Sequence, residues 1–416
     1  MIVRSLDPLR LDDEELWVAG DRIAEPGLGE EIDPRGGLVL PGNVCAHTHL
    51  YSALARGMPY VLEPPRDFLQ ILQRVWWRLD RALDEQSIRA SALVGGMEAL
   101  LSGTTTLIDH HASPNAIDGS LDIVADALES LGVRSVLCYE TSDRDGPERA
   151  QAGVEENRRF YRTKRPLTRG LIGAHASFTL SDETLLACAD AGPLHIHAAE
   201  GVVDTGAVGR LARLGVIDEH TLLAHGIHVD DEELADFRAS GATLAHNARS
   251  NMNNAVGRAR VLELGPRVAL GTDGIGSDMF EESRSAWFRL REDDLLAPWG
   301  FPLTALAESA RLAGRIFAEP LLGTLDPGAP ADLVVLDYTP PAPLDSSNLG
   351  GHWIFGLSSR HVRDVMVAGR WVVRGHRLAL LDQDELATEA RGDAERLWSR
   401  LAETPVHTFD PQGAIS

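Results

Sequence analysis

The chain has 416 residues, of which 44% are hydrophobic and 24% are charged, which suits about two or three globular domains. Its formal net charge of -23 argues against a partner such as nucleic acid or an anionic membrane, because both need clustered positive charge. It contains no apolar run long enough to span a membrane, no secretory signal after Met1, and only three widely spaced cysteines, so we expect a cytoplasmic protein.

The two ends of the chain share one pattern. Residues 1–37 contain short strand-like pieces with turn signals, and the residues after about 325 resume this pattern. Because chain ends often lie close together, we expect them to form one small β-sandwich domain. We assign it residues 1–45 and 321–416, including a helix from about Asp384 to Leu401.

The middle of the chain alternates apolar runs with helix-compatible segments. The runs are residues 38–49, 104–111, 134–141, 169–177, 193–200, 221–228, 242–250 and 267–274. They are typical of parallel strands that are covered on both faces, and Ser181 and Asp230 are typical N-caps of the helices between them. The alternation predicts an α/β fold with a (β/α)8 TIM barrel over residues 46–320, and an open doubly wound sheet is the alternative.

Histidines gather at the ends of these runs. In a (β/α)8 enzyme the chemistry takes place at the C-terminal ends of the strands, so residues there are candidates for an active site. Those positions hold His47, His49, His111, His175, His197, Glu200, His225, His246 and Asp273.

Four of these residues have the composition of a metal site. His47 and His49 alternate along a strand, so both imidazoles face the same side. Such a pair alone is more often structural, but His197 adds a third nitrogen and Asp273, which lies among glycines, adds a carboxylate. Three imidazoles and one carboxylate, with a position left for water, suit a catalytic zinc, iron or manganese ion.

The order and spacing of five motifs resemble the amidohydrolase superfamily, in its aminohydrolase and chlorohydrolase branch. This branch includes deaminases of cytosine, guanine and adenosine derivatives. The motifs are Leu40-Pro-Gly-Asn-Val-Cys-Ala-His-Thr-His, His195-Ile-His-Ala-Ala-Glu, Leu223-Ala-His-Gly-Ile-His, Ala245-His-Asn-Ala-Arg-Ser-Asn and Leu270-Gly-Thr-Asp-Gly. Three further segments resemble an aminohydrolase subgroup associated with selenium metabolism: Asp109-His-His-Ala-Ser-Pro, Asn251-Met-Asn-Asn-Ala-Val-Gly and Gly274-Ile-Gly-Ser-Asp-Met-Phe.

The resemblance implies a role for each candidate residue. It makes Glu200 the proton shuttle and His225 the residue that orients the water and the leaving group and stabilises the tetrahedral centre. The implied metal ligands are His47, His49, His197 and Asp273, with Asp273 also taking a proton from the water. The implied substrate contacts are His175 and His246, and we add His111 as a candidate.

The resemblance also bears on the number of metal ions. Relatives with two metals bridge them with a modified lysine at the end of the fourth strand, where this chain has His175, and its single lysine, Lys164, lies upstream. We therefore expect one divalent ion, Zn²⁺, with Fe²⁺ or Mn²⁺ as alternatives.

The implied activity is metal-dependent hydrolytic deamination of a small heterocycle of the purine, pterin, pyrimidine or triazine type, with release of ammonia. The alternatives are hydrolysis of a C–Cl bond or of a cyclic amide in the same site, and a non-catalytic relative, which would be expected to have damaged ligands. Long strand–helix loops and tryptophans expected at the surface favour a homodimer.

Some residues near the motifs have a structural interpretation as well as a functional one. Residues 109–111 form either an extra pocket wall or a hydrogen-bonded strand cap. His195 is more typical of a residue that supports a ligand, and Trp76 and Trp77 are more typical of a core or a subunit interface. For Arg249 we favour an ion pair within its loop over contact with an anionic substrate.

Overall fold

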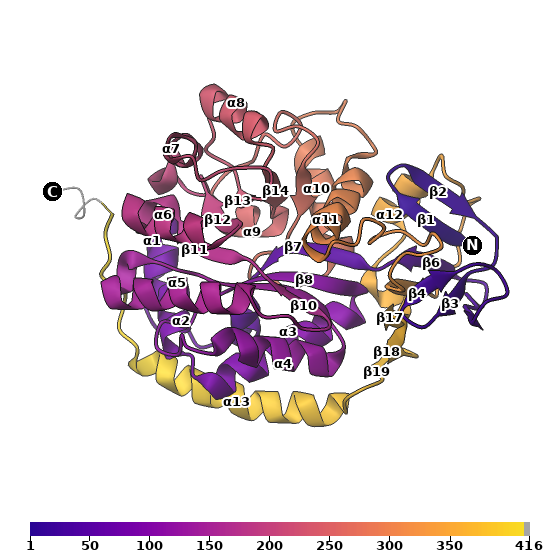
Figure 1. Ribbon diagram of the computed structural model, residues 1–416, viewed down its shortest axis with the longest axis horizontal. Coiled ribbons are helices and arrows are strands. Elements are labelled where there is room, and N and C mark those ends of the chain that lie inside the picture. Colours follow the sequence, from indigo (N-terminus) through magenta and orange to yellow (C-terminus); the bar gives the residue numbers. More distant parts are fainter. Residues whose placement is uncertain (412–416) are drawn as a thin grey trace.

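Parallel β-strands form a closed barrel at the centre of the computed structural model, which describes residues 1–411 (Figure 1). Hydrogen bonds link the strands into two sheets, in the orders β10-β9-β8-β7 and β11-β12-β13-β14-β15. Parallel bridges from Thr48 to Asp273 and from Thr141 to Ala174 join these sheets at both seams. Since β10 and β11 are two parts of the fourth strand, the predicted (β/α)8 barrel is confirmed and the open sheet is excluded.

The barrel strands lie where the apolar runs predict them. They are β7 Asn43–Thr48, β8 Thr104–His111, β9 Arg134–Tyr139, β10 Thr168–Gly170, β11 Ile172–Ala176, β12 Leu194–Ala198, β13 Leu222–His225, β14 Thr243–His246 and β15 Val268–Leu270. Every residue of β7, β8 and β9 is buried, because helices cover the outside of the barrel and side chains fill its inside.

Helices surround the barrel. The main ones are α3 Glu85–Leu101, α4 Ser120–Leu131, α5 Pro147–Tyr161, α6 Asp182–Ala191, α7 Ala207–Leu214, α8 Asp231–Ser240, α10 Met279–Arg291 and α11 Phe301–Phe317. The predicted N-caps are confirmed, since Ser181 and Asp230 each accept a hydrogen bond from the backbone N–H three residues later.

Shorter elements lie in the connections between strands and helices. They are α1 Phe68–Ile71, α2 Trp77–Ala82, α9 Ala248–Asn253, the π-helical turn η2 Leu72–Trp76, and the 3₁₀ turns η1 Leu50–Ala55, η3 Asp143–Asp145, η4 Ser177–Thr179, η5 Val202–Asp204 and η6 Ser359–His361. Several of these connections follow the C-terminal ends of the strands, where they surround the candidate site.

Strands from both chain ends share a seven-stranded sheet in the order β19-β18-β17-β16-β6-β1-β2, and a three-stranded sheet has the order β4-β3-β5. Val18 and Ile23 of the small sheet and Leu333 of the large one belong to a single apolar cluster, so the two sheets pack as a small sandwich. The strands are β1 Ile2–Leu6, β2 Leu9–Asp12, β3 Trp17–Ala19, β4 Arg22–Ala24, β5 Glu30–Glu31, β6 Leu38–Pro41, β16 Leu333–Leu336, β17 Val362–Val367, β18 Arg370–Arg374 and β19 Arg377–Leu378.

The two helices after β16 leave the terminal sheet. Helix α12, Leu349–Phe355, contacts α10, and helix α13, Gln383–Glu403, runs along the barrel beside α2 and α3 (Figure 1). Trp398 donates a hydrogen bond to the carbonyl of Leu54 at 2.8 Å, and Leu397 and Leu401 are buried. The apolar face of α13 is therefore buried against helices of the barrel.

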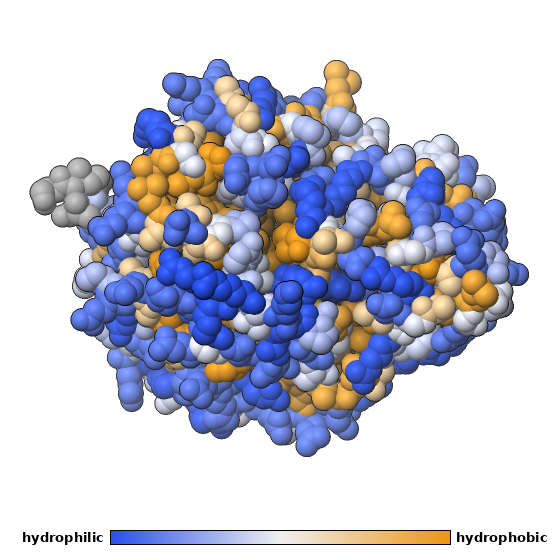
Figure 2. Space-filling model, in the orientation of Figure 1, coloured by the Kyte–Doolittle hydropathy of each residue, from blue (hydrophilic) through white to orange (hydrophobic). Residues whose placement is uncertain are grey.

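The surface in Figure 2 is mostly hydrophilic, with scattered apolar patches. Among residues 1–411, no helix combines the length and the hydropathy that a membrane span requires.

A buried ion pair connects the barrel with the terminal sheet. The guanidinium of Arg134, at the start of β9, donates to both carboxylate oxygens of Asp332 at 2.8 and 3.1 Å, and the side chains are 8% and 4% exposed. We expect Arg134→Leu to lower the free energy of unfolding by about 3–5 kcal/mol, because it leaves a carboxylate buried without its cation. Chemical denaturation measures this loss.

The control for this prediction is Arg10→Leu, which removes the more exposed ion pair with Asp326 and should cost less than about 1 kcal/mol. Equal losses in Arg134→Leu and Arg10→Leu would contradict the prediction.

Candidate active site

Three histidines and one aspartate meet at the C-terminal ends of the barrel strands. His47 lies near the end of β7, His49 directly after it, His197 in β12, and Asp273 after β15. The Nε2 atom of His49 is 3.1 Å from Nε2 of His197 and 3.2 Å from Oδ1 of Asp273. The ring of His47 meets those of His49 and His197 edge-on, with centroids 4.8 and 4.9 Å away. The structure therefore brings the four candidate ligands together.

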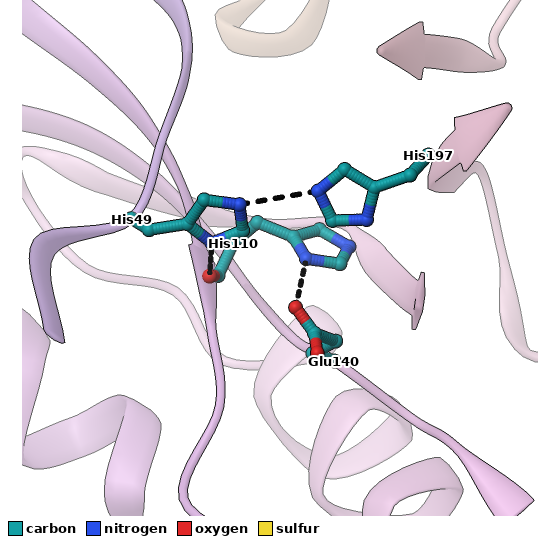
Figure 3. A group of neighbouring side chains, drawn as sticks. All are labelled: His49, His110, Glu140 and His197. Carbon is teal, nitrogen blue, oxygen red and sulfur yellow. Dashed lines mark hydrogen bonds and ion pairs between the residues drawn. The ribbon is translucent and has the colours of Figure 1, made fainter. Parts of the chain in front are cut away.

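Hydrogen bonds from outside this centre hold the Nδ1 atom of each histidine. The Nδ1 of His49 donates to the carbonyl of His110, as Figure 3 shows, and that of His197 donates to the carbonyl of His175, both at 2.6 Å. The Nδ1 of His47 is 2.9 Å from Nε2 of His195, which therefore supports a candidate ligand, as expected. Such contacts orient the Nε2 lone pairs toward a shared point, as in metal sites of proteins.

The donor set fits a divalent cation. The Nε2 of His47 is buried without a hydrogen-bond partner among the described residues. Burial and the neighbouring imidazoles lower the pKa of His47 and of His197 well below the usual value, so both offer neutral lone pairs. Burial alone would also lower the pKa of His49, but Asp273 raises it to about 9. A cation bound here satisfies the lone pairs and replaces the proton beside Asp273.

Unusual backbone conformations mark the strand ends at this centre. Ala199, His225 and Asp273 have φ values of 54°, 76° and 53°, a region that side chains other than glycine rarely adopt. Such residues cost about 1–3 kcal/mol each and cluster at functional sites. At Gly271 a Cβ atom would lie 2.4 Å from Oδ1 of Asn247 and 2.7 Å from Cβ of His47, so glycine is required for this close approach.

Glu200, His225 and Asp273 form a group beside the candidate ligands. The Nε2 of His225 is 3.4 Å from Oε2 of Glu200 and 3.9 Å from Oδ2 of Asp273. Burial, together with the Asp273 carboxylate, raises the pKa of Glu200 well above its usual value, which favours the protonated form of Glu200. Burial opposes ionisation of Asp273 as well, but His49 lowers its pKa. A carboxylic acid therefore lies close to an ionised carboxylate, which is an arrangement suited to proton transfer.

Hydrogen bonding sets the state of His225. Its Nδ1 donates to Oδ1 of Asn251 at 2.9 Å, and its Nε2 has no hydrogen-bond partner among the described residues. Burial lowers the pKa of His225, so the neutral ring presents Nε2 as an acceptor toward Glu200. In this state His225 suits the orienting role implied by the resemblance, whereas stabilising an oxyanion would require a second proton on its ring.

A pocket opens beside these groups. Its walls include the apolar side chains of Phe68, Leu72 and Trp76, and its polar end includes candidate ligands and Glu200. A flat heterocycle suits such a pocket, because aromatic walls contact its faces while polar groups contact its edge. The remaining lining residues are Tyr51, Trp77, Glu140, His175, Ala176, Phe178, Asp204 and Asn254.

The predicted substrate contacts differ in their position. His175 lines the pocket, whereas His111 is fully buried with its Nε2 3.0 Å from Oγ of Ser113, and His246 is buried outside the lining. Side chains alternate along β8, and the ring of His110 is the one that lies near the centre, 4.8 Å from that of His197. The geometry therefore does not support substrate contact by His111 or His246, and the segment after β14 reaches the pocket through Asn254 instead.

Glu140, which directly follows β9, also lines the pocket but is absent from the sequence-based candidates. Its Oε2 lies 3.2 Å from Nδ1 of His110, as Figure 3 shows. A carboxylate directly after an apolar strand, at the same end of the barrel as the histidines, was the available signal.

The geometry bears on the structural roles expected for residues 109–111, Arg249 and Trp76. Residues 109–111 are fully buried, and Asp109 accepts a hydrogen bond from the backbone of Leu50 at 2.7 Å, which confirms the strand cap. Arg249 pairs with Glu282 at 2.6 Å, which confirms an ion pair, but the partner lies on helix α10 rather than within the same loop. Trp76, by contrast, reaches the pocket rather than lying only in a core.

The model of the amidohydrolase family matches residues 38–372 of this chain. Two curated relatives resemble it over nearly their full length. The 5'-deoxyadenosine deaminase of Methanopyrus kandleri is 30% identical over 93% of this chain and 91% of its own length. The 5-methylthioadenosine/S-adenosylhomocysteine deaminase of Haloarcula marismortui is 31% identical over 92% of this chain and 94% of its own.

Solved structures share the fold. An adenosine deaminase from Xanthomonas campestris with bound zinc superposes with a TM-score of 0.76 at 22% identity, covering 96% of this chain and 97% of its own. An atrazine chlorohydrolase from Arthrobacter aurescens complexed with zinc gives 0.77 at 23% identity, covering 94% of this chain and 99% of its own. The family model, the curated relatives and the barrel agree, and the chain belongs to the amidohydrolase family.

Proposed function

We propose that this protein deaminates an amino-substituted nitrogen heterocycle by hydrolysis, with the purine of an adenosine derivative as the first candidate. The observation that carries the proposal is the group of Glu200, His225 and Asp273 beside the four candidate metal ligands. It places a proton donor and a proton acceptor at the polar end of a pocket with flat apolar walls. The names of the curated relatives, which are adenosine-derivative deaminases, support the same reaction class.

Each residue of this group has a role that follows from its protonation state. Asp273, which is ionised, takes a proton from the attacking water. Glu200, which is protonated, gives its proton to the ring nitrogen next to the carbon that bears the amino group. The neutral His225 accepts a hydrogen bond at Nε2 and so orients the water for attack. The proton held by Asp273 then passes to the amino group, which leaves as ammonia, and the new hydroxyl returns a proton to Glu200 as the carbonyl forms.

We propose Zn²⁺ as the ion, held by His47, His49, His197 and Asp273, with Fe²⁺ or Mn²⁺ as alternatives. A divalent ion in such a site lowers the pKa of a bound water from 15.7 to about 7 and so supplies a nucleophile at neutral pH.

The experiment is a panel of amino-purines, amino-pterins, amino-pyrimidines and amino-triazines offered to the metal-loaded protein, with ammonia measured by a coupled assay. Ammonia release with formation of the matching carbonyl product supports the proposal. Release of chloride from a chlorotriazine without deamination, opening of a cyclic amide, or no reaction with any compound would overturn it.

The charge of the pocket predicts which adenosine derivatives react. Its lining includes the carboxyl groups of Glu140, Glu200, Asp204 and Asp273 and, among the described residues, no lysine or arginine. A negative substituent beside the ionised carboxylates of Glu140 and Asp273 finds no cationic side chain in the lining to pair with, so we expect adenosine 5'-monophosphate to have a kcat/KM at least about 100-fold below that of adenosine. Removing the neutral 5'-hydroxyl, as in 5'-deoxyadenosine, should change kcat/KM by less than about tenfold. Equal rates for the nucleoside and its monophosphate would contradict this prediction.

A further inference from the structure

Glu140 has no part in the chemistry described above, although its carboxylate lines the pocket. Two groups contact it from behind. Arg144 donates from Nη1 to Oε1 at 3.3 Å, and Nδ1 of His110 lies 3.2 Å from Oε2, while Nε2 of the same ring donates to the carbonyl of His195 at 3.0 Å. The guanidinium favours the ionised form of the carboxylate, and the two contacts fix its plane.

The guanidinium of Arg144 is itself held in place. Its side chain is only 2% exposed, and it pairs with Asp80 and with Asp145 as well as with Glu140. It also lies over the ring of Trp77, 5.2 Å from the centroid. A buried arginine with three carboxylate partners cannot turn into the pocket, so Glu140 presents a fixed negative group whose charge is balanced from behind.

His175 presents a second acceptor next to Glu140. The hydroxyl of Thr179 donates to the carbonyl of Ala176 at 3.0 Å, so its oxygen accepts from Nδ1 of His175 at 2.7 Å. In the neutral ring this bond places the only proton on Nδ1. Its Nε2 therefore offers a lone pair.

The two acceptors face each other without a donor between them. The Nε2 of His175 lies 3.7 Å from Oε1 of Glu140, which is too long for a hydrogen bond, and neither atom carries a hydrogen. One carboxylate can accept about four hydrogen bonds, and the bond from Arg144 occupies one lone pair of Oε1, so capacity remains on the pocket side of Glu140. Buried acceptors of this kind require a donor from water or from a ligand.

Only some groups can serve both acceptors at once. A hydroxyl has one hydrogen, and a ring nitrogen without hydrogen or a carbonyl has none, whereas an amino group has two. An amino group also reproduces the hydrogen bonds of a water molecule that it displaces, so its binding loses little. A second metal ion is disfavoured at this position, because the Arg144 guanidinium already lies 3.3 Å from the same carboxylate.

We propose that Glu140 and His175 form a subsite for a second amino group of the substrate, on the side of strands β9 and β11, apart from the amino group that is removed. The inference deepens the proposed function and names its substrate class, which is a diamino-substituted heterocycle without anionic substituents. Glu140 is then a residue that determines specificity, while Glu200, His225 and Asp273 carry out the reaction.

The test measures binding, so that it does not depend on turnover. Purine, 2-aminopurine and 8-aminopurine lack the 6-amino group, and calorimetry with the metal-loaded protein gives their dissociation constants. We expect one of the two amino isomers to bind at least tenfold more tightly than purine. If neither does, the inference is wrong, whether or not the enzyme deaminates other compounds.

The variant Glu140→Gln assigns the effect to this carboxylate. Its amide oxygen can still accept from Arg144, but its amide N–H₂ then replaces an acceptor with a donor, so the tenfold preference for the amino isomer should disappear. Glu281→Gln is the matched control, since that carboxylate pairs with Arg249 and lies outside the pocket lining, and it should keep the preference.

Metal analysis of the same samples tests whether Glu140→Gln acts by losing the metal ion rather than by losing a contact with the amino group. Glu140→Gln should hold as much metal as the unchanged protein, and a loss of metal would overturn the inference by making Glu140 a ligand. With diamino-substrates, the variant should raise KM much more than it lowers kcat. An unchanged KM with a lowered kcat would also overturn the inference, because it would place Glu140 in the reaction itself.

Discussion

Glu200→Gln is expected to keep its metal and its fold and to lose about 10²- to 10⁴-fold in kcat, because proton transfer by a positioned acid or base contributes a factor of this size. Glutamine has nearly the same shape as the protonated glutamate. The side-chain nitrogen of Asn254 lies 3.5 Å from Oε1 of Glu200, and the amide oxygen of a glutamine can accept the same hydrogen bond. The substitution therefore removes the transferable proton and little else.

The burial of Glu200 explains the size of the expected loss. Its carboxyl is buried next to Asp273, which raises its pKa and keeps it protonated at a pH where an exposed glutamate would be ionised. No other carboxyl in the described part of the chain combines such a raised pKa with a place beside His225.

The measurement is steady-state kinetics with the best substrate of the panel, together with metal analysis and a melting curve. Glu281→Gln, the same exchange at an exposed carboxylate, should leave kcat unchanged. Near-normal turnover in Glu200→Gln would show that the proton comes from elsewhere, and loss of metal would show that the residue supports the ion rather than the reaction.

The barrel could be predicted from the sequence because its strands are short, apolar and buried on both faces, a pattern that parallel strands share. The candidate ligands could be predicted for a related reason. Each lies at a strand end, and in a closed barrel all strand ends meet, so His47 and Asp273 come together despite their separation in the chain.

The position of a residue at a strand end does not show which of His110 and His111 faces the centre of the barrel. Adjacent side chains on a strand point to opposite faces, and the pairing of β7 with β8 shifts its register between Cys45 and Thr48. A second shift lies between Asn43 and Val44, and each shift changes which residues of the two strands lie side by side. The sequence shows both residues, but the register follows from the packing of the whole barrel.

Glu140 was not predictable for a different reason. Its environment depends on Arg144, four residues later, and on Asp80, which comes from a helix before the second strand. Neither residue forms a motif with Glu140, and an acidic residue after a strand is more often solvated. Only the three-dimensional contacts separate a carboxylate that lines a pocket from one at the surface.

Removal of the metal ion is expected to abolish turnover and to destabilise the fold at the same time. His47, His197 and Asp273 lie at the ends of three different strands, and the described residues offer no partner to the buried Nε2 of His47. An ion that binds only the folded state stabilises it by about 2.7 kcal/mol at a concentration of 100 times its dissociation constant. A chelator should therefore lower the melting temperature as well as the rate.

The experiment separates the effect of the metal ion from a general loss of folded protein. Dialysis against a chelator should reduce activity to background, and one equivalent of Zn²⁺, Fe²⁺ or Mn²⁺ should restore it, whereas His197→Ala should stay inactive at any metal concentration. His220→Ala is the control, because His220 is exposed and precedes β13, at the opposite end of the strand from His225. If the chelated protein kept its rate, or if His197→Ala bound the metal as tightly as the unchanged protein, the three imidazoles and the carboxylate would not be the ligands, and the roles assigned to Asp273 and Glu200 would fail with them.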